Sequence, residues 1–466
     1  MTDAPEKSDV VEEEGESERL YGLDPALVPR VAEAIEADDA PALVALLEPL
    51  HASEVADLLE ELSSDEREVL LEHARGKIDP ETLAYLDDSV REDVLEMLEP
   101  GEVAAAITVL DTDDALNVIV DLEPEDQEAV LRELSPPDRA ILEEALSFPE
   151  DSAGRLMQRE LVTVPGTWSV GDTIDYMRNR AASLPSDFYD IFVVDSDRKP
   201  LGKVPLSRLM RNRRPVQVAD ILITDTYPVP VTMDQEEVAL LFQQYSLVSV
   251  PVVNEAGRLV GVITVDDVVD VIHEEAEEDI MRLGGVREDD FYDAVLDTTR
   301  SRFSWLLINL GTAIAASLVI GVFETTIEQV VALAVLMPIV ASMGGNAGTQ
   351  TLTVAVRALA MKELTTANAL RIVSKEVLVG GINGIVFALL IGLIAWAWFG
   401  EPLIGVVIAA AMIINLLIAG FSGIIIPLLL ERMEIDPAVA SGVVLTTVTD
   451  VVGFFSFLGL AALVLL

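Results

Sequence analysis

The stretch TTVTDVVGFF, residues 446–455, places one carboxylate, Asp450, inside a run that is otherwise suited to lipid. From Pro437 to Leu466 the sequence holds no other Asp, Glu, Lys or Arg. A helix crosses the hydrocarbon core in about 20 residues, so this run is long enough to span a bilayer with Asp450 near its middle. A charge at that depth costs at least about 2.5 kcal/mol and normally faces a bundle interior or a water-filled cavity.

Four further uncharged runs precede this one, and each is also long enough to cross a bilayer. They hold 21, 28, 24 and 29 residues and are separated by charged connections. We therefore predict an all-α transmembrane domain over 301–466. Its five helices are expected at about 303–323, 329–356, 377–400, 402–430 and 438–465.

The charges in the connections predict the orientation in the membrane. Arg357, Lys362, Arg371 and Lys375 all fall between the second and third runs, whereas the first and third connections carry no Lys or Arg. Because basic connections tend to stay in the cytoplasm, we expect the second connection to be cytoplasmic. Five spans then place the N-terminal domains inside the cell and the C-terminus outside, in a multi-pass protein of the plasma membrane.

The rest of the chain is strongly acidic. Of the 466 residues, 80 are Asp or Glu and 30 are Lys or Arg, for a net charge of −50, yet residues 301–466 carry only about −3 of it. This charge argues against nucleic acid as a partner, because phosphates would be repelled. It suits a function at a cation-rich surface or a halophilic cytoplasm, and we favour the halophilic interpretation for most of these carboxylates. Cysteine is absent, which excludes disulfides and thiolate metal sites, and we predict a disordered acidic tail over 1–20.

Short helical phrases recur over 21–150. In HASEVADLLEELSSDEREVLLE, for example, Val55, Leu58, Leu59 and Leu62 recur at the three- and four-residue spacing of one helix face. Pro, Ser or Asp begins each phrase, as is typical of helix N-termini. The pattern predicts a superhelical stack of short helices whose hand it leaves open. Most acidic residues here are expected on a solvated outer face.

The pattern then changes to an α/β unit that occurs twice, over 151–213 and 214–272. The second copy reads as a strand, a helix, two strands and a helix in YPVPVTM, DQEEVALLFQQYS, VSVPVVN and LVGVITVDDVVDVI. This tandem resembles a pair of CBS domains, which implies a regulatory unit. In GVITVDD, Thr264 and Asp267 match the ribose-phosphate signature of that family, whereas Ser207 of the first copy lacks the following acid. Thr264 and Asp267 either bind an adenine nucleotide such as ATP or only cap the last helix.

The connection over 273–300 begins with a helix that is crowded with acids. Glu275, Glu278 and Asp279 lie three and four residues apart, so their carboxylates share one face. Like charges there are destabilising unless a cation or a basic partner lies between them. A solvated acidic helix is one interpretation. We favour a cation-sensing segment, because this helix joins the cytosolic domains to the first span.

The second transmembrane run contains MPIVASMGGNAGTQTLTVAVRALA. Pro338, followed by the glycines Gly344, Gly345 and Gly348, predicts a weakened helix. Backbone released from helical hydrogen bonds at membrane depth must face protein or water. Small residues also serve close helix packing, which is the alternative. We favour a pore-lining segment, because oxygen-bearing side chains follow the glycines. They belong to Asn346, Thr349, Gln350, Thr351 and Thr353.

Three interpretations compete for the charge of Asp450. A basic partner within the predicted spans is excluded, because none of them carries Lys or Arg. A proton-relay acid is an open alternative. We favour a cation site, because Thr446 and its neighbouring threonines add oxygens, and oxygen-only ligands suit a hard cation. Mg²⁺ keeps several of its waters and is commonly held by one or two carboxylates, so a symmetric dimer could place two Asp450 side chains around one hydrated ion.

These features together resemble the MgtE family of Mg²⁺ channels and transporters, over nearly the whole chain after the first 20 residues. The resemblance rests on the domain order and on GGNAGTQ and TTVTDVVGF in the membrane part. It implies a multidomain fold with an α-helical superhelical N domain, α/β tandem CBS domains and a five-helix all-α transmembrane domain. It also implies a homodimer with the pore between its two transmembrane domains and Asp450 binding hydrated Mg²⁺. The expected pore-lining residues are Gly344, Gly345, Asn346, Thr349 and Thr446.

The resemblance further implies that Mg²⁺ bound among acidic cytosolic sites closes the pore when cytosolic Mg²⁺ is high. In the N domain, whose repeats also contribute ligands in the family, Asp113 and Asp114 are the candidates. Two positions depart from the family pattern: Thr349 replaces an Asn but keeps an oxygen, and Ser246 replaces an acid. The matching regulatory positions are Asp234, Glu236, Asp267, Glu275, Glu278, Asp279 and Asp436.

We therefore expect a Mg²⁺-gated Mg²⁺ channel, not an enzyme, that admits Mg²⁺ to the cytoplasm down its electrochemical gradient. Its expected partners are membrane lipid and a second copy of the chain, with no nucleic acid. One alternative is a proton-coupled transporter regulated by adenine nucleotide through Thr264 and Asp267, with Asp450 as the proton carrier. A second alternative is a membrane-anchored sensor that transports nothing.

Overall fold

The computed structural model describes residues 22–185, 188–286, 295–365, 367–433 and 435–466. The acidic tail predicted over 1–20 and part of the connection predicted over 273–300 lie outside the described residues. The chain divides into two compact units, Met1–Val269 and Asp270–Leu466.

The first unit begins with a series of short helices. Side chains fix several of their N-termini by accepting hydrogen bonds from backbone N–H groups that have no partner within the helix. His51 with Glu54 and Ser63 with Glu66 form reciprocal capping boxes at the starts of α3 and α4. The helices are α1 (Leu27–Glu36), α2 (Ala40–Leu47), α3 (Ala52–Glu61), α4 (Ser64–His73), α5 (Thr82–Tyr85), α6 (Asp88–Glu96), α7 (Pro100–Ile107), α8 (Thr112–Val120), α9 (Pro124–Glu133), α10 (Pro136–Leu146) and α11 (Ala153–Leu156).

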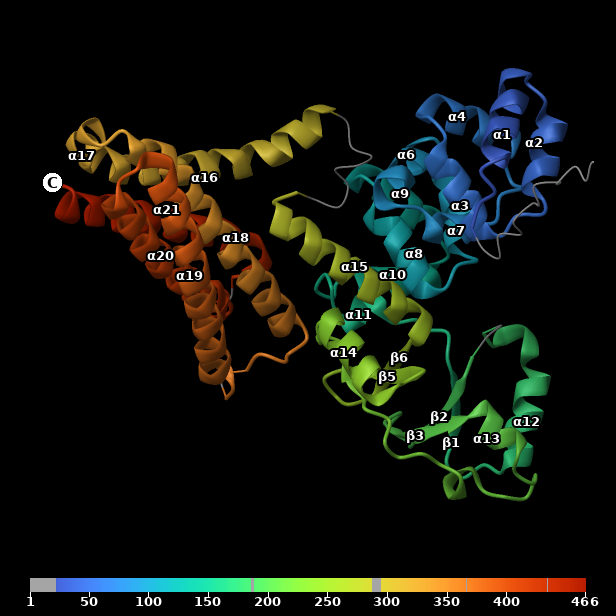
Figure 1. Cartoon of the computed structure of the whole chain (residues 1–466). Helices are drawn as coiled ribbons and strands as arrows, with labels where there is room; N and C mark the ends of the chain where they lie inside the picture. The colour runs from blue at the N-terminus through green and yellow to red at the C-terminus, as the bar shows by residue number, and fades with distance from the viewer. Residues whose placement is uncertain (1–21, 186–187, 287–294, 366, 434) are drawn as a thin grey trace, which may run out of the picture. The chain divides into compact units, whose positions relative to one another are not determined.

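One apolar core joins α1 to α10, which follow one another as a continuous array (Figure 1). Val55, Leu58, Leu59 and Leu62 are all buried in this core, as their spacing predicts. The short helices bury their apolar faces against one another, and most of their acidic side chains are left at the surface. The predicted helical N domain is confirmed.

Two α/β modules follow, each built on a three-stranded sheet. In both sheets the first strand pairs in parallel with the second, and the second pairs antiparallel with the third. The register shifts at corresponding places, between Val193 and Val194 and between Val252 and Val253. This repeated topology confirms the predicted duplication. The elements are β1 (Val162–Pro165), α12 (Val170–Asn179), β2 (Asp190–Val194), β3 (Pro200–Pro205), α13 (Leu206–Met210), β4 (Val229–Pro230), α14 (Gln235–Tyr245), β5 (Ser249–Val253), β6 (Leu259–Thr264) and α15 (Val265–Gly284).

The second unit begins within α15 and contains five helices that are long and apolar enough to cross a membrane. The five-helix transmembrane domain expected from the uncharged runs is therefore confirmed in its fold. Its helices are α16 (Val295–Val322), the short α17 (Glu324–Gln329), α18 (Ala332–Ala360), α19 (Ala369–Phe399), α20 (Pro402–Arg432) and α21 (Pro437–Val464).

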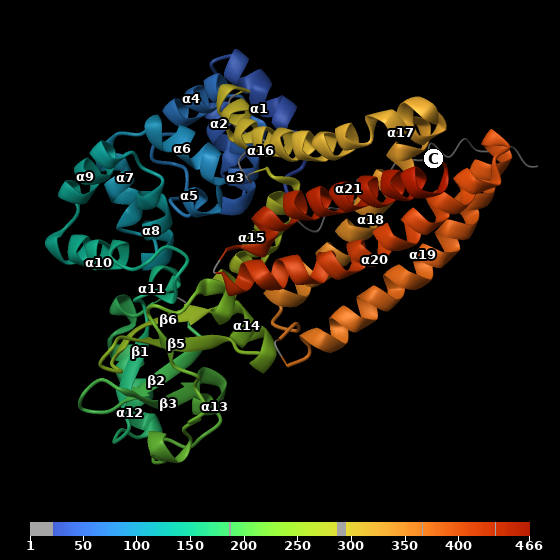
Figure 2. The ribbon, with the colours of Figure 1, turned by 90° about the vertical axis from the view of Figure 1, so that its left-hand side faces the viewer.

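Helix α20 lies at the centre of this bundle. It packs against α18, α19 and α21, and Figure 2 shows it between α19 and α21. Leucine, isoleucine and other large apolar side chains are exposed along α16 and α19. Such surfaces suit helices that face lipid, because the hydrocarbon core takes the place of a protein interior.

Helix α18 continues without interruption through Pro338 and its glycines. The weakened helix predicted for this segment is therefore wrong, and Gly344 and Gly348 serve close packing. The side chain of Asn415 on α20 fills the space beside Gly344, and a Cβ atom built on Gly348 would lie 3.1 Å from the side chain of Leu445 on α21. Glycine lowers helix propensity by about 1 kcal/mol, but small residues let transmembrane helices approach closely.

Candidate functional site

One face of α18 is polar in the middle of a helix that is otherwise apolar. Asn346 Nδ2 donates to Ser342 Oγ at 3.3 Å, and Thr353 Oγ1 donates to the Thr349 carbonyl at 3.0 Å. Polar groups are poorly tolerated against hydrocarbon, so this face requires water or protein beside it. We call these exposed residues the polar stripe, and they are Ser342, Asn346, Thr349, Gln350 and Thr353.

The structure separates the predicted pore-lining residues of α18 into two groups. Asn346 and Thr349 belong to the polar stripe, and a Cβ atom on Gly345 would meet nothing within 4 Å. Gly344 instead lies buried against Asn415. Thr351 is also buried and points away from the stripe, with its hydroxyl 3.4 Å from Glu376 Oε2.

Asp450 lies midway along α21 and is half-buried. Within the described part of the chain, no hydrogen bond or ion pair reaches its carboxylate. The neighbouring hydroxyls bond to their own helix: Thr446 Oγ1 donates to the Gly442 carbonyl at 3.0 Å and Thr447 Oγ1 to the Val443 carbonyl at 2.6 Å. Each hydroxyl oxygen still has lone pairs with which it could accept from a hydrated ion.

Acids of α15 meet the first residues of α21. Arg282 forms an ion pair with Glu278 and a second with Asp436, whose Oδ2 lies 2.6 Å from Arg282 Nη1. Asp436 also caps α21, because its Oδ1 accepts a backbone N–H of the first turn at 2.7 Å. Burial raises the pKa of Asp279, and the carboxylates of Asp436 and Glu275 raise it further. The predicted acids are thus brought together, and one arginine partly neutralises them.

Two more predicted acids approach each other inside the first unit. Asp113 of α8 is buried, and its Oδ1 has no hydrogen-bond partner in the described chain. Burial raises the pKa of Asp113 well above its ordinary value, and the charges of Asp267 and then Asp114 add to the shift. A cation between Asp113 and Asp267 would relieve both the burial cost and the repulsion.

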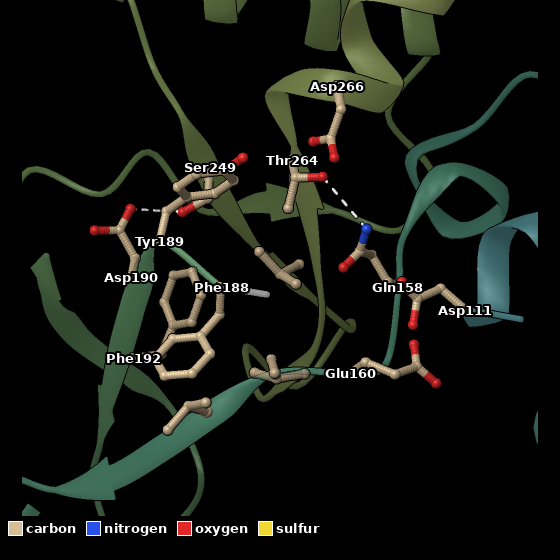
Figure 3. A pocket seen from close by; sticks show the side chains of 13 residues that line it. Asp111, Gln158, Glu160, Phe188, Tyr189, Asp190, Phe192, Ser249, Thr264 and Asp266 are labelled. Atoms are coloured by element: carbon tan, nitrogen blue, oxygen red, sulfur yellow. Dashed lines mark hydrogen bonds between the residues drawn. The ribbon is translucent and has the colours of Figure 1, made fainter. Parts of the chain in front are cut away.

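A pocket of about 520 Å³, counting the solvent at its mouth, lies beside Thr264 (Figure 3). Thr264 Oγ1 donates to Asp267 Oδ2 at 2.7 Å, and Gln158 Nε2 donates to Thr264 Oγ1 at 3.3 Å. None of the described lining residues is basic. The polar lining comprises Asp111, Gln158, Glu160, Asp190, Ser249, Thr264 and Asp266, and the aromatic lining comprises Phe188, Tyr189 and Phe192.

A buried ion pair supports one wall of this pocket. Lys203 Nζ lies 2.7 Å from Asp190 Oδ2 and donates to the Ser249 carbonyl at 2.9 Å. Ser249 Oγ donates to the same Asp190 oxygen at 2.7 Å. Because Lys203 is already engaged, its charge stabilises the wall and is not directed at a ligand in the pocket.

The remaining predicted metal ligands lie at the start of α14. Asp234 is the N-cap of this helix, and its Oδ1 accepts from the Glu236 backbone N–H at 2.9 Å. Ser246, where the family pattern has an acid, ends the same helix in a left-handed conformation with φ of 51°. In the described residues no three Asp, Glu or His side chains converge as a ready metal site.

Sequence reasoning missed three residues that the structure makes prominent. Arg282 lies among the connecting acids, Gln158 bonds to the predicted nucleotide pair, and Asn415 is fully buried in the membrane bundle. Arg282 has a local signal in its spacing from Glu278, four residues earlier, but its second partner, Asp436, is distant in sequence. Gln158 carries no local signal, because its partners Thr264 and Asp267 are distant. Asn415 had one, since it is the single amide in the apolar run 402–430.

Models of known families match three parts of the chain. The model for the MgtE intracellular N domain matches residues 50–151, and the CBS domain model matches residues 153–214 and 218–274. The MgtE model, described as a divalent cation transporter, matches residues 337–460.

Several known proteins are similar to this chain. A protein named magnesium transporter MgtE from Thermus thermophilus is 36% identical over 327 residues, which cover 69% of this chain and 72% of the relative. A protein of the same name from Bacillus subtilis is 33% identical over 317 residues, which cover 68% of this chain and 70% of the relative. The solved cytosolic domain of the Mg²⁺ channel MgtE in complex with ATP is 31% identical, with a TM-score of 0.49, covering 52% of this chain and 99% of that chain. The solved soluble part of a magnesium transporter is 26% identical, with a TM-score of 0.46. The match covers 54% of this chain and 98% of that chain.

Proposed function

This chain belongs to the MgtE family of divalent cation transporters, and from that premise we propose that it conducts Mg²⁺ into the cytoplasm. It is a multi-pass membrane protein with a cytosolic N-terminal domain. The observation that carries the proposal is the position of Asp450, midway along an apolar helix and without a cationic partner among the described residues. A carboxylate in such a place is stabilised when a cation shares its site.

Oxygen ligands and a single carboxylate suit Mg²⁺ that keeps most of its water. Mg²⁺ dehydrates reluctantly and is commonly held by one or two carboxylates with several waters retained. The lone pairs of Thr446 could accept from such waters, one helical turn from Asp450. Weak contacts through water would let the ion leave as well as enter.

A homodimer would complete the ion path. In one chain both the polar stripe of α18 and Asp450 lack a polar neighbour on another helix among the described residues. A two-fold axis would set the same patch of each copy against its twin. Two stripes and two Asp450 carboxylates would then enclose water within the surrounding lipid.

The membrane potential can drive the proposed inward movement without chemical fuel. Each charge gains about 2.3 kcal/mol per 100 mV, so a divalent ion gains about 4.6 kcal/mol. The basic connection between α18 and α19 supports a cytoplasmic position for that connection and, with five spans, an external C-terminus.

We also propose that cytosolic Mg²⁺ closes the path. Asp113 and Asp267 fit such a regulatory ion, because a buried oxygen without a partner lies near a second carboxylate. Glu275, Asp279 and Asp436 form the other group, in which Arg282 holds Asp436 until a cation competes for it. Bound Mg²⁺ would screen the repulsion and hold the acidic segments together.

Adenine nucleotide is the proposed ligand of the pocket beside Thr264. Its aromatic side chains can stack on a base, and its acids can accept from ribose hydroxyls. Because the described lining has no basic residue, the phosphates would extend toward solvent. Binding of ATP to the purified chain, weakened by Asp267→Ala, tests this role.

Flux into liposomes tests the main proposal. We expect Mg²⁺ uptake by the purified chain without an imposed pH gradient, and loss of that uptake in Asp450→Asn. Glu401→Gln, which removes an exposed carboxylate between α19 and α20, is the matched control and should transport normally. Uptake that requires a pH gradient would instead support a proton-coupled transporter, and an absence of uptake would support a sensor.

A further inference from the structure

Asn415 is a buried polar residue at the centre of the transmembrane bundle. Its exposed fraction is 0%, and it lies on α20, the helix that contacts α18, α19 and α21. Its Nδ2 donates to the Val340 carbonyl of α18 at 2.9 Å. Its Oδ1 is buried and has no hydrogen-bond partner in the described part of the chain.

The amide of Asn415 fits between two glycines on two other helices. A Cβ atom on Gly344 of α18 would overlap the amide and lie 2.7 Å from Asn415 Cγ. A Cβ atom on Gly453 of α21 would lie 2.8 Å from Asn415 Nδ2. Any side chain at either glycine would therefore displace the amide, and we call this arrangement the glycine socket.

Stability alone does not account for an amide in this place. A buried carbonyl oxygen without a donor costs free energy, whereas a leucine of similar size would fill the space without that cost. Departures from such local rules are expected where function requires them. The two helices that the amide joins are the ones that matter for the ion: Gly344 lies two residues before Asn346 of the polar stripe, and Gly453 three residues after Asp450.

We propose that Asn415 is a positioning residue for ion conduction. By filling the glycine socket and holding the Val340 carbonyl, it sets the polar stripe of α18 at a fixed distance from Asp450 on α21. This inference rests on the proposed Mg²⁺ conduction. It assigns to Asn415 no contact with the ion itself.

The first test replaces the amide by an apolar side chain of similar size. For Asn415→Leu in liposomes we expect the Mg²⁺ concentration that gives half-maximal flux to rise by about tenfold, because small displacements of supporting groups loosen a binding site. Fewer folded molecules would lower the maximal flux and leave the half-maximal concentration unchanged. Asn309→Ala is the control, because it removes an amide that bonds at 3.1 Å to a carbonyl of its own helix, α16.

A double-mutant cycle tests the socket even if the leucine variant does not fold. Gly344→Ala should raise the half-maximal concentration by itself, and adding Asn415→Ser should reverse at least about half of that change, because contacting residues couple energetically. Unchanged half-maximal concentrations in Asn415→Leu, or purely additive effects in the cycle, would overturn the positioning role. A wild-type chain without Mg²⁺ flux would overturn the proposed function, and this inference with it.

Discussion

Asp450 and Asp279 are both half-buried carboxylates of the second unit, but their surroundings are opposite. Asp450 has no ionic or hydrogen-bonding partner among the described residues. Asp279 lies near Asp436 and Glu275, and its pKa is raised by burial and by both charges. A single unpaired carboxylate suits an ion that binds and then leaves. Crowded carboxylates repel one another, and a bound cation relieves that repulsion. The two arrangements thus match the proposed roles of conduction and sensing.

The largest effect is expected at the solitary carboxylate. Asp450→Asn keeps the size of the side chain and removes its charge, so Mg²⁺ flux should fall by at least about a hundredfold. Asp450→Glu, which keeps the charge, should retain a measurable part of the flux. Radiotracer or dye-based uptake into liposomes measures both. Equal loss in the two variants would show that geometry matters there more than charge.

The crowded carboxylates should control closure and not conduction. With Glu275→Gln, Glu278→Gln and Asp279→Asn combined, flux at high internal Mg²⁺ should exceed that of the wild type by about tenfold, a typical allosteric coupling. Flux at low Mg²⁺ should be unchanged. The control Glu274→Gln with Glu277→Gln removes charges from the same helix. Normal closure in the triple variant would remove these acids from the sensor.

Asp113 extends the comparison to a fully buried carboxylate. Because burial raises the pKa of Asp113 in the folded state, ionisation of this carboxyl destabilises the fold. The destabilisation is complete at pH values above the folded-state pKa, and it disappears below the unfolded-state pKa of about 3.9. Asp113→Asn should therefore raise the Tm of the Mg²⁺-free chain by about 3 °C at neutral pH, and by less as the pH falls. Thermal unfolding of the full chain in detergent measures this.

Magnesium provides the control for that experiment. The Tm of the wild type should rise when Mg²⁺ is added, because a ligand stabilises only the form that binds it. The Tm of Asp113→Asn should rise by less. A lower Tm for Asp113→Asn without Mg²⁺ would show that the carboxylate contributes hydrogen bonds that outweigh its burial.

The smallest effect is expected at Asp234, which combines a structural and a proposed metal role. Asp234→Ala should lower the free energy of unfolding by about 1 kcal/mol through loss of the cap on α14. Asp234→Ser should retain the cap and lose only the carboxylate. If Asp234 binds regulatory Mg²⁺, both variants should shift the Mg²⁺ concentration for half-closure by about twofold, a small allosteric change. A serine variant with wild-type closure would leave Asp234 as a cap only.

Much of the architecture could be predicted from the sequence, because its signals are local. The uncharged runs predict the five spans, the spacing of Val55, Leu58 and Leu59 predicts a buried helix face, and the repeated strand order predicts the two modules. The prediction for α18 was wrong because glycine has two opposite uses. In isolation it weakens a helix, and against a neighbouring helix it permits close contact.

The sequence by itself thus determined the order of domains, the five apolar helices and the solitary charge of Asp450, since periodicity and composition are properties of short segments. Only the tertiary structure decided which distant groups meet. Asp113 approaches Asp267 across 154 positions, Arg282 pairs with Asp436, and Asn415 lies between Gly344 and Gly453. Such contacts depend on how helices and modules pack, and packing is set by the shapes of surfaces assembled from remote parts of the chain.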